Sequence, residues 1–109
     1  MFKDVKNALQ IIDLYKHLIA EKKEFVLSKQ VLRSGTAVGA LIREAEHAQS
    51  RADFLNKMNV SLKEANETEY WLMLLKDSGF LVQVEFDSIH ENCVELIRLL
   101  ASIVKTLKS

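Results

Sequence analysis

The stretch RSGTAVGALIREA, residues 33–45, places two glycines four positions apart inside a sequence of helical periodicity. A glycine in a helix interior costs about 1 kcal/mol relative to alanine, so Gly35 and Gly39 need a compensating role. Because they share one side of the helix, we expect them to lie on a packed face, where the missing side chains let a neighbouring helix approach closely. The stretch therefore predicts a tightly packed helical bundle.

A phosphate-binding loop is the other interpretation of SGTAVG, residues 34–39. No strand-like segment precedes it, and the Lys-Ser/Thr pair of a P-loop does not follow it. We favour the packing interpretation.

The composition is typical of uninterrupted helices in one domain. The 109 residues include no Pro and only three Gly, and 49% are hydrophobic. This length supports a single hydrophobic core, so we expect one domain over residues 1–109. The lone Cys93 cannot form an intramolecular disulfide, and neither a signal peptide nor a membrane-spanning run is visible. We expect a cytoplasmic protein without a membrane partner.

Apolar residues recur at helical spacing along the chain, which predicts four helices at about 2–20, 24–49, 51–78 and 84–107. Ser50 and Asp53 resemble a capping box, and Gly79 follows the third helix as a C-cap. Short connections make consecutive helices antiparallel. The predicted fold class is all-α, an antiparallel up-down-up-down four-helix bundle.

Helical projection assigns an inward face to each helix. The fourth helix has the cleanest stripe, formed by Phe86, Ile89, Cys93, Leu96, Ile97, Leu100, Val104 and Leu107. For the first helix we predict burial of Val5, Ala8, Leu9, Ile12, Tyr15 and Ile19. Its remaining apolar residues, Ile11, Leu14 and Leu18, extend beyond that stripe.

The third helix is apolar on two faces and therefore needs two partners. Its outer face carries a tryptophan, and the outward line of the second helix carries two alanines where long charged side chains are more usual. Self-association through these helices is the economical interpretation. The predicted oligomer interface consists of Arg33, Ala37, Ala40, Glu44, Val60, Glu64, Glu67, Trp71 and Leu74.

The candidates for catalysis are weak. Glu46 and Glu69 project inward as an acid/base pair or half of a metal site would, but a buried carboxylate normally recruits a cation, here Arg43, Lys76 or Arg98. Glu44 and His47 have the E-x-x-H spacing of di-iron bundles, but a second such motif is missing. We predict no catalytic residue, no cofactor and no metal, and expect that the protein is not an enzyme.

The segment LSKQVLRSGTAVGALIREAEHAQSRADFLNKMNVSLKEANETEYWLMLL, residues 27–75, resembles the four-helix-bundle family of the ribosomal RNA intervening-sequence proteins. The resemblance implies a five-fold ring of bundles. A relative, the accessory protein of diversity-generating retroelements, pairs with a reverse transcriptase and binds nucleic acid. The resemblance implies packing and assembly roles for Arg33, Gly35, Gly39, Arg43, Glu44, Asp53, Glu64, Glu67, Thr68 and Trp71.

Two departures from the family pattern, Ala37 in place of Ser and Leu41 in place of Asn, remove polar groups. The formal net charge of zero also contrasts with the basic relative.

Two function classes follow: a homo-oligomer, with a pentamer favoured, that binds RNA or an RNA-processing protein, and an oligomeric scaffold without a nucleic-acid role. Neutrality means that RNA affinity must come from local clusters of charge. The best candidates for contact are Lys3, Lys6, Lys16, Lys22 and Lys23. Basic residues gathered at one mouth of the ring favour the first class.

Overall fold

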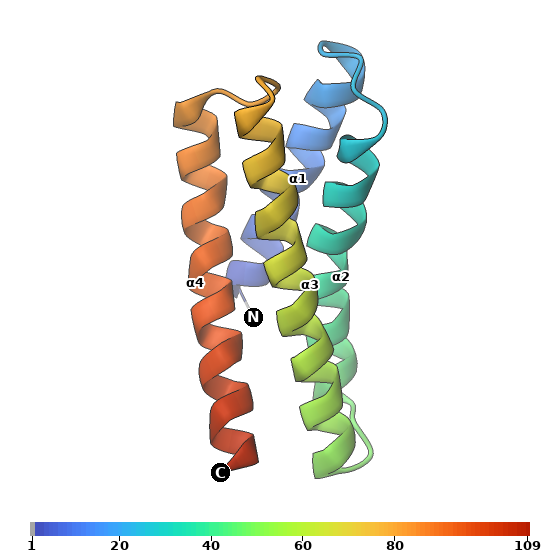
Figure 1. Ribbon diagram of the computed structural model, residues 1–109. Helices are drawn as coiled ribbons and strands as arrows, with labels where there is room; N and C mark the ends of the chain where they lie inside the picture. The colour runs from blue at the N-terminus through green and yellow to red at the C-terminus, as the bar shows by residue number, and fades with distance from the viewer. Residues whose placement is uncertain (1) are drawn as a thin grey trace.

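The computed structural model of the protein describes residues 2–109, which form four helices and no strand. They are α1 (Phe2–Ala20), α2 (Leu27–Glu46), α3 (Arg51–Asp77) and α4 (Gln83–Lys108). The helices run alternately up and down along a bundle of 44 × 21 × 20 Å (Figure 1). The predicted fold class is confirmed.

Helix α2 packs between α1 and α3, and α4 packs against α3 and α1. The α1–α2 and α3–α4 turns lie at one end of the bundle and the α2–α3 turn at the other (Figure 1). Helix α1 is the shortest, and its N-terminal end lies near mid-height. The half of the bundle that holds the α2–α3 turn is therefore built from three helices.

Local side-chain chemistry sets the helix ends. Ser50 Oγ accepts a 3.0 Å hydrogen bond from the backbone N–H of Asp53 at the start of α3, and Gly79 follows the end of α3 with φ of 85°. Helix α2 begins at Leu27, three residues after its predicted start, because Glu24 caps it from outside. The Glu24 carboxylate accepts hydrogen bonds from the backbone N–H groups of Val26, Leu27 and Ser28 at 3.0, 2.9 and 2.6 Å.

Two clusters of buried side chains form the core. One lies where all four helices meet and includes Ile11, Leu14, Leu18, Val31, Leu72, Leu75, Phe86, Ile89 and Cys93. The other lies in the three-helix half and includes Val38, Ile42, Met58, Ala65, Leu96, Leu100 and Val104. The predicted stripe of α4 is confirmed, with Ile97 and Leu107 half-buried rather than buried.

The predicted facing of α1 is wrong. Val5 and Leu9 are 47% and 57% exposed, whereas Ile11, Leu14 and Leu18 are buried together with the polar residues Asp4 and Asn7. The predicted members Ala8, Ile12, Tyr15 and Ile19 are half-buried. The helix is rotated so that its 4-7-11-14-18 line faces the core.

The two glycines of α2 explain this rotation. A Cβ on Gly35 would lie 2.5 Å from Ile11 Cδ1, and one on Gly39 would lie 3.0 Å from Asp4 Oδ2. Ile11 is fully buried, so it has little room to yield. The predicted close helix approach at these glycines is confirmed, and the neighbour is α1.

The seam between α1 and α4 is more polar. Gln10 Nε2 donates to Ser88 Oγ at 3.2 Å, and Asn92 Nδ2 donates to Gln10 Oε1 at 2.7 Å. Two open grooves of about 380 Å³ each meet at Gln10 and Ser88. This seam is therefore less completely filled by side chains than the core.

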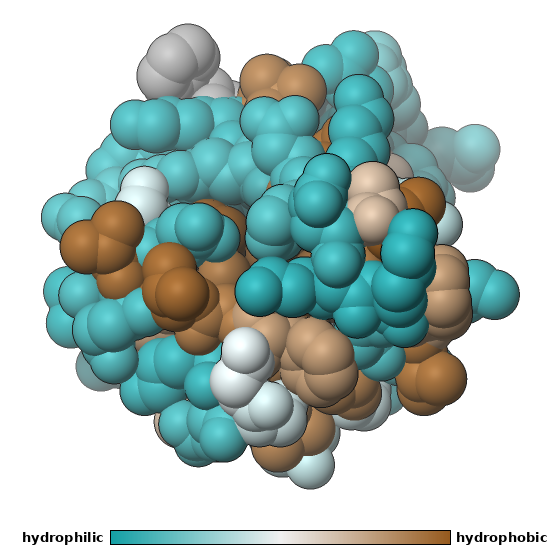
Figure 2. All heavy atoms as spheres, turned by 90° about the horizontal axis from the view of Figure 1, so that it is seen from above, coloured by the Kyte–Doolittle hydropathy of each residue, from teal (hydrophilic) through white to brown (hydrophobic). Residues whose placement is uncertain are grey.

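No helix in the described part of the chain has the length and hydropathy needed to cross a membrane. Figure 2 looks onto the end of the bundle that carries the α1–α2 and α3–α4 turns, where apolar side chains emerge between hydrophilic ones. The exposed apolar residues of these turns and of the start of α4 are Phe25, Val26, Val82 and Val84.

Candidate interface along helices α2 and α3

Buried hydroxyl groups join α2 to α3. The Thr68 hydroxyl lies 2.9 Å from Ser34 Oγ and 2.8 Å from the Glu64 carbonyl oxygen, and Ser61 Oγ donates to the Val38 carbonyl at 2.9 Å. All three hydroxyl-bearing residues are almost completely buried. Satisfied buried polar groups restrict how two helices can slide past one another, so these bonds help to fix the register of α2 on α3.

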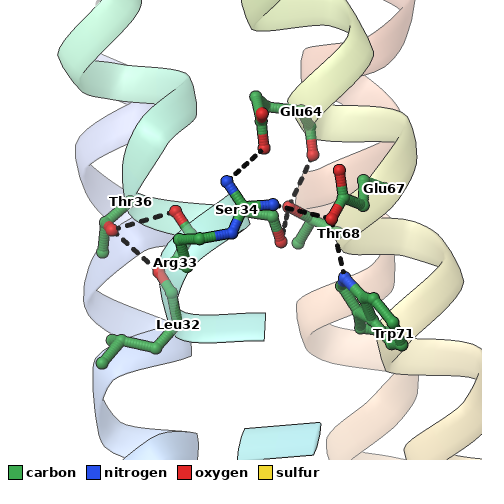
Figure 3. Close-up of polar contacts among 8 residues, drawn as sticks. All are labelled: Leu32, Arg33, Ser34, Thr36, Glu64, Glu67, Thr68 and Trp71. Carbon is green, nitrogen blue, oxygen red and sulfur yellow. Dashed lines mark hydrogen bonds and ion pairs between the residues drawn. The ribbon is translucent and has the colours of Figure 1, made fainter. Parts of the chain in front are cut away.

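Next to these hydroxyls, Arg33 of α2 spans two carboxylates of α3 (Figure 3). Its Nη2 lies 2.7 Å from Glu67 Oε1, and its Nη1 lies 3.4 Å from Glu64 Oε2. Trp71 Nε1 donates to the same Glu67 Oε1 at 3.2 Å. We call these four residues, Arg33, Glu64, Glu67 and Trp71, the Arg33 cluster.

The electrostatics of the Arg33 cluster favour an ordered guanidinium. The pKa of Arg33 is raised mainly by its hydrogen bond to Glu67, and the negative charge of Glu64 raises it further. The Glu64 Oε2 atom is buried and makes an ion pair with Arg33, but no described donor gives it a hydrogen bond of good geometry. Arg33 is therefore the group that compensates the buried end of the Glu64 carboxylate.

The exposed side of the Arg33 cluster is both aromatic and charged. The Arg33 side chain is 53% exposed, and Tyr70, also exposed, packs edge-on against Trp71 with ring centroids 5.2 Å apart. Arginine, tryptophan and tyrosine are the residue types that most often dominate binding at protein interfaces. The arrangement suits recognition of another protein surface.

Of the nine predicted interface residues, Arg33, Glu64, Glu67 and Trp71 meet across the α2–α3 seam, whereas Ala40 lines a groove between α1 and α2. Arg33, Ala40 and Glu44 are exposed, and Ala37, Val60, Glu64, Glu67, Trp71 and Leu74 are half-buried. Several of the charged ones are already paired within the chain, which the sequence pattern did not reveal. Besides the Arg33 cluster, Glu44 lies 3.6 Å from Lys57 Nζ, a residue that sequence analysis missed.

A second surface feature arises from the corrected facing of α1. The exposed side chains of Val5 and Leu9 border a groove of about 220 Å³ between α1 and α2. Gly39, Ala40 and Arg43 line its other side. We call this the α1–α2 groove; it was not predicted, because Val5 and Leu9 were assigned to the core.

The five lysines predicted to contact nucleic acid do not form one cluster. Lys3 Nζ lies 2.5 Å from Glu95 Oε2, and Lys6 lines the same groove as Glu91 and Glu95. Lys22 and Lys23 lie in the α1–α2 turn, beyond Ala20, and the helical rise from Lys3 to Ala20 alone is about 26 Å. Lys16 is exposed on α1, and Lys23 Nζ donates to the Ala20 carbonyl at 2.9 Å. The structure thus separates Lys3 and Lys6, which share a groove with two carboxylates, from the pair in the turn.

The two carboxylates considered for catalysis, Glu69 and Glu46, do not lie together in the core. Glu69 Oε2 lies 2.8 Å from His90 Nε2, so its partner is a histidine of α4 and not one of the predicted Arg43, Lys76 or Arg98. Glu46, predicted to point inward, is exposed.

Cys93 lies deep in the core, as predicted. Burial is the main cause that raises the pKa of the Cys93 thiol to about 12, and the negative charge of Glu69 adds to it. Among the described residues no group of three His, Cys, Asp or Glu side chains is placed to bind a metal ion.

Comparison with known proteins agrees with this architecture. Residues 3–102 match the family model described as 23S rRNA-intervening sequence protein. A search of curated proteins gave no match. Among solved structures, a protein of unknown function from the S23 ribosomal protein family of Bacteroides thetaiotaomicron VPI-5482 is 56% identical, with a TM-score of 0.93 over 94% of this chain and 95% of that chain.

Proposed function

Because the chain belongs to the family of 23S rRNA-intervening sequence proteins, we propose that it is a non-catalytic homo-oligomer that acts in the cytoplasm as an RNA-binding or RNA-processing accessory factor. We further propose that the oligomer is a closed ring of five copies. The number five follows from the family resemblance of residues 27–75, whereas self-association is supported by the surface of this chain.

The Arg33 cluster is the observation that carries self-association. It presents arginine and tryptophan side chains at the surface, both held in place by Glu67. These features are typical of the centre of an interface.

A ring also needs two different surfaces on each copy, because each copy contacts its two neighbours in a head-to-tail manner. The α1–α2 groove, bordered by Val5 and Leu9, is a concave apolar surface. The outer side of α3 near Trp71 is an aromatic surface of a different kind, since Tyr70 and Met73 are 56% and 44% exposed there. We propose that the aromatic surface of one copy packs on the α1–α2 groove of the next.

Native mass spectrometry at micromolar concentration tests this proposal. We expect a species of five times the 12.5 kDa chain mass. A monomer under these conditions would contradict both the interface and the assembly inferred from the family.

The RNA role rests on the α1–α2 turn. Lys22 and Lys23 are exposed there, and in a ring of bundles standing side by side the turn would repeat around one rim. Contacts to several phosphates would then act together although each chain is neutral.

The second candidate function is an oligomeric scaffold that does not bind nucleic acid. The pairing of Lys3 with Glu95 favours it, since Lys3 and Lys6 share their groove with two carboxylates and contribute little net positive charge. RNA titration at low salt separates the two candidates.

A further inference from the structure

Helix α4 is divided into an acidic half and a basic half. Between Gln83 and Ile97 it carries no Lys or Arg, and its acidic residues are Glu85, Asp87, Glu91 and Glu95. From residue 98 to 109 it carries no Asp or Glu, and its basic residues are Arg98, Lys105 and Lys108. The two kinds of charge are separated along the axis of one helix.

The helix macrodipole accounts for only part of this separation. Acidic residues are favoured in the first turn of a helix and basic residues in the last, and the effect falls off within those turns. Glu85, Lys105 and Lys108 occupy such positions. Glu91 and Arg98 lie in the middle of α4, where the macrodipole gives no reason for their signs.

The charges lie on the outer side of α4. Asp87, Glu91, Arg98 and Lys105 are all exposed. On the same helix Val84 and Leu99 are 79% and 37% exposed and add apolar surface. Because α1 begins near mid-height, the basic half of α4 packs with α2 and α3 but is not covered by α1 (Figure 1).

The protein itself leaves much of this charge without a partner. Glu95 pairs with Lys3. The hydrogen bond from Lys3 is the main cause that lowers the pKa of Glu95, and the positive charge of Lys3 lowers it further. Within the described chain, Glu91 and Lys105 form no ion pair. The outer face of α4 therefore has charge available for an external surface of matching pattern.

We propose that two copies of this chain pair through the outer faces of α4, with the two helices antiparallel about a twofold axis. A twofold contact uses the same surface on both copies. In the antiparallel arrangement the acidic half of each α4 faces the basic half of the other, whereas a parallel arrangement would place like charges together. The charge pattern thus selects both the partner, a second copy, and its direction.

This contact is independent of the proposed ring, because it uses α4 and the ring uses α1, α2 and α3. Without a ring the contact gives two copies, and where its twofold axis crosses the fivefold axis of a ring at right angles it gives ten. Native mass spectrometry distinguishes the cases by stoichiometry. One copy excludes both contacts, two copies support α4 pairing alone, five support the ring alone, and ten support both.

Charge reversal with rescue tests the pairing. We expect Arg98→Glu/Lys105→Glu to halve the mass measured at about 50 mM salt, and Asp87→Lys/Glu91→Lys to do the same. The variant with all four changes restores complementarity and should regain the doubled mass. Lys16→Glu/Lys29→Glu, which reverses two exposed lysines outside α4, is the matched control and should keep it.

Circular dichroism of each variant checks that the bundle is folded. For the unaltered protein, raising the salt to about 500 mM should also halve the mass, because screening weakens exposed ion pairs. An odd number of copies at low salt would overturn the proposal. So would failure of the variant with all four substitutions to regain the mass that both double variants lose.

Discussion

Ile11 occupies the space that a side chain on Gly35 would need. Its Cδ1 atom lies 2.5 Å from the position of a Cβ at residue 35, and Ile11 is fully buried. The contact explains why α2 retains a glycine at a position where helix propensity alone favours alanine.

We therefore predict that Gly35→Ala lowers the free energy of unfolding. Overpacking costs about 1–3 kcal/mol, and the gain in helix propensity returns about 1 kcal/mol or less. Gly39→Leu should also destabilise, because even its Cβ would approach Asp4 Oδ2 to 3.0 Å. Urea denaturation of both variants measures the change. A more stable variant at either position would mean that α1 does not pack against that glycine as described.

Trp71→Ala should shift the oligomer toward monomer. Truncation of a central aromatic residue at an interface commonly costs about 2 kcal/mol or more of binding free energy. Sedimentation velocity over a range of concentrations measures the shift. Trp71→Phe keeps most of the apolar surface but loses the hydrogen bond to Glu67, so it separates the two contributions. An unchanged oligomer in the alanine variant would exclude Trp71 from the interface.

The Glu24 cap predicts a dependence of stability on pH. Burial raises the pKa of Glu24, but hydrogen bonds from the backbone N–H groups of Leu27, Ser28 and Val26 outweigh it and hold the pKa below the ordinary 4.5. A carboxylate with a depressed pKa stabilises the fold above the unfolded value, and this stabilisation is lost as the pH falls through the folded value. Glu24→Ala should cost about 0.5–2 kcal/mol at neutral pH, as loss of a helix cap does.

Thermal denaturation of the wild type and of Glu24→Gln between about pH 3 and pH 7 tests the sign. The stability difference between them should be constant at neutral pH and shrink below about pH 4.5. A difference that grows on acidification would show that the carboxylate is not the stabilising form.

For RNA, we expect binding that weakens steeply with salt and depends on Lys22 and Lys23. Counterion release gives a slope of about −0.7 in log affinity against log salt for each neutralised single-strand phosphate. Lys22→Glu/Lys23→Glu should weaken binding of a labelled structured RNA and reduce the slope. Lys3→Glu, at the lysine paired with Glu95, is the comparison and should have a smaller effect. Lack of binding by the wild type at low salt would leave the scaffold function.

The sequence predicted most of the fold because helical periodicity runs through the whole chain and because α2 and α4 each have one clear apolar stripe. In α4 that stripe, with Leu96 and Leu100 at its centre, is buried as expected. Helix α1 was harder, since apolar residues cover two adjacent lines and periodicity alone cannot choose between them. The choice depends on α2, whose glycines admit Ile11 and Asp4, and on buried polar groups that a hydrophobic pattern assigns to solvent.

The candidate interface was predicted as a set of positions but not as a set of contacts. Residues 33, 64, 67 and 71 were selected by their outward projection. The bonds from Arg33 to Glu67 and Glu64 join positions more than thirty residues apart, which a single helical projection cannot relate. The α1–α2 groove was missed for the same reason that α1 was placed wrongly.

The short length of α1 and its polar seam with α4 also bear on how the molecule opens. Among the described side chains, α1 contributes three buried apolar residues to the core, Ile11, Leu14 and Leu18, fewer than α2, α3 or α4, and beside Gln10 and Ser88 its seam with α4 is interrupted by grooves. Partial unfolding follows the elements with the least buried apolar surface. The amides of α1 should therefore exchange with deuterium before those of the other helices, through a state in which α2, α3 and α4 remain together.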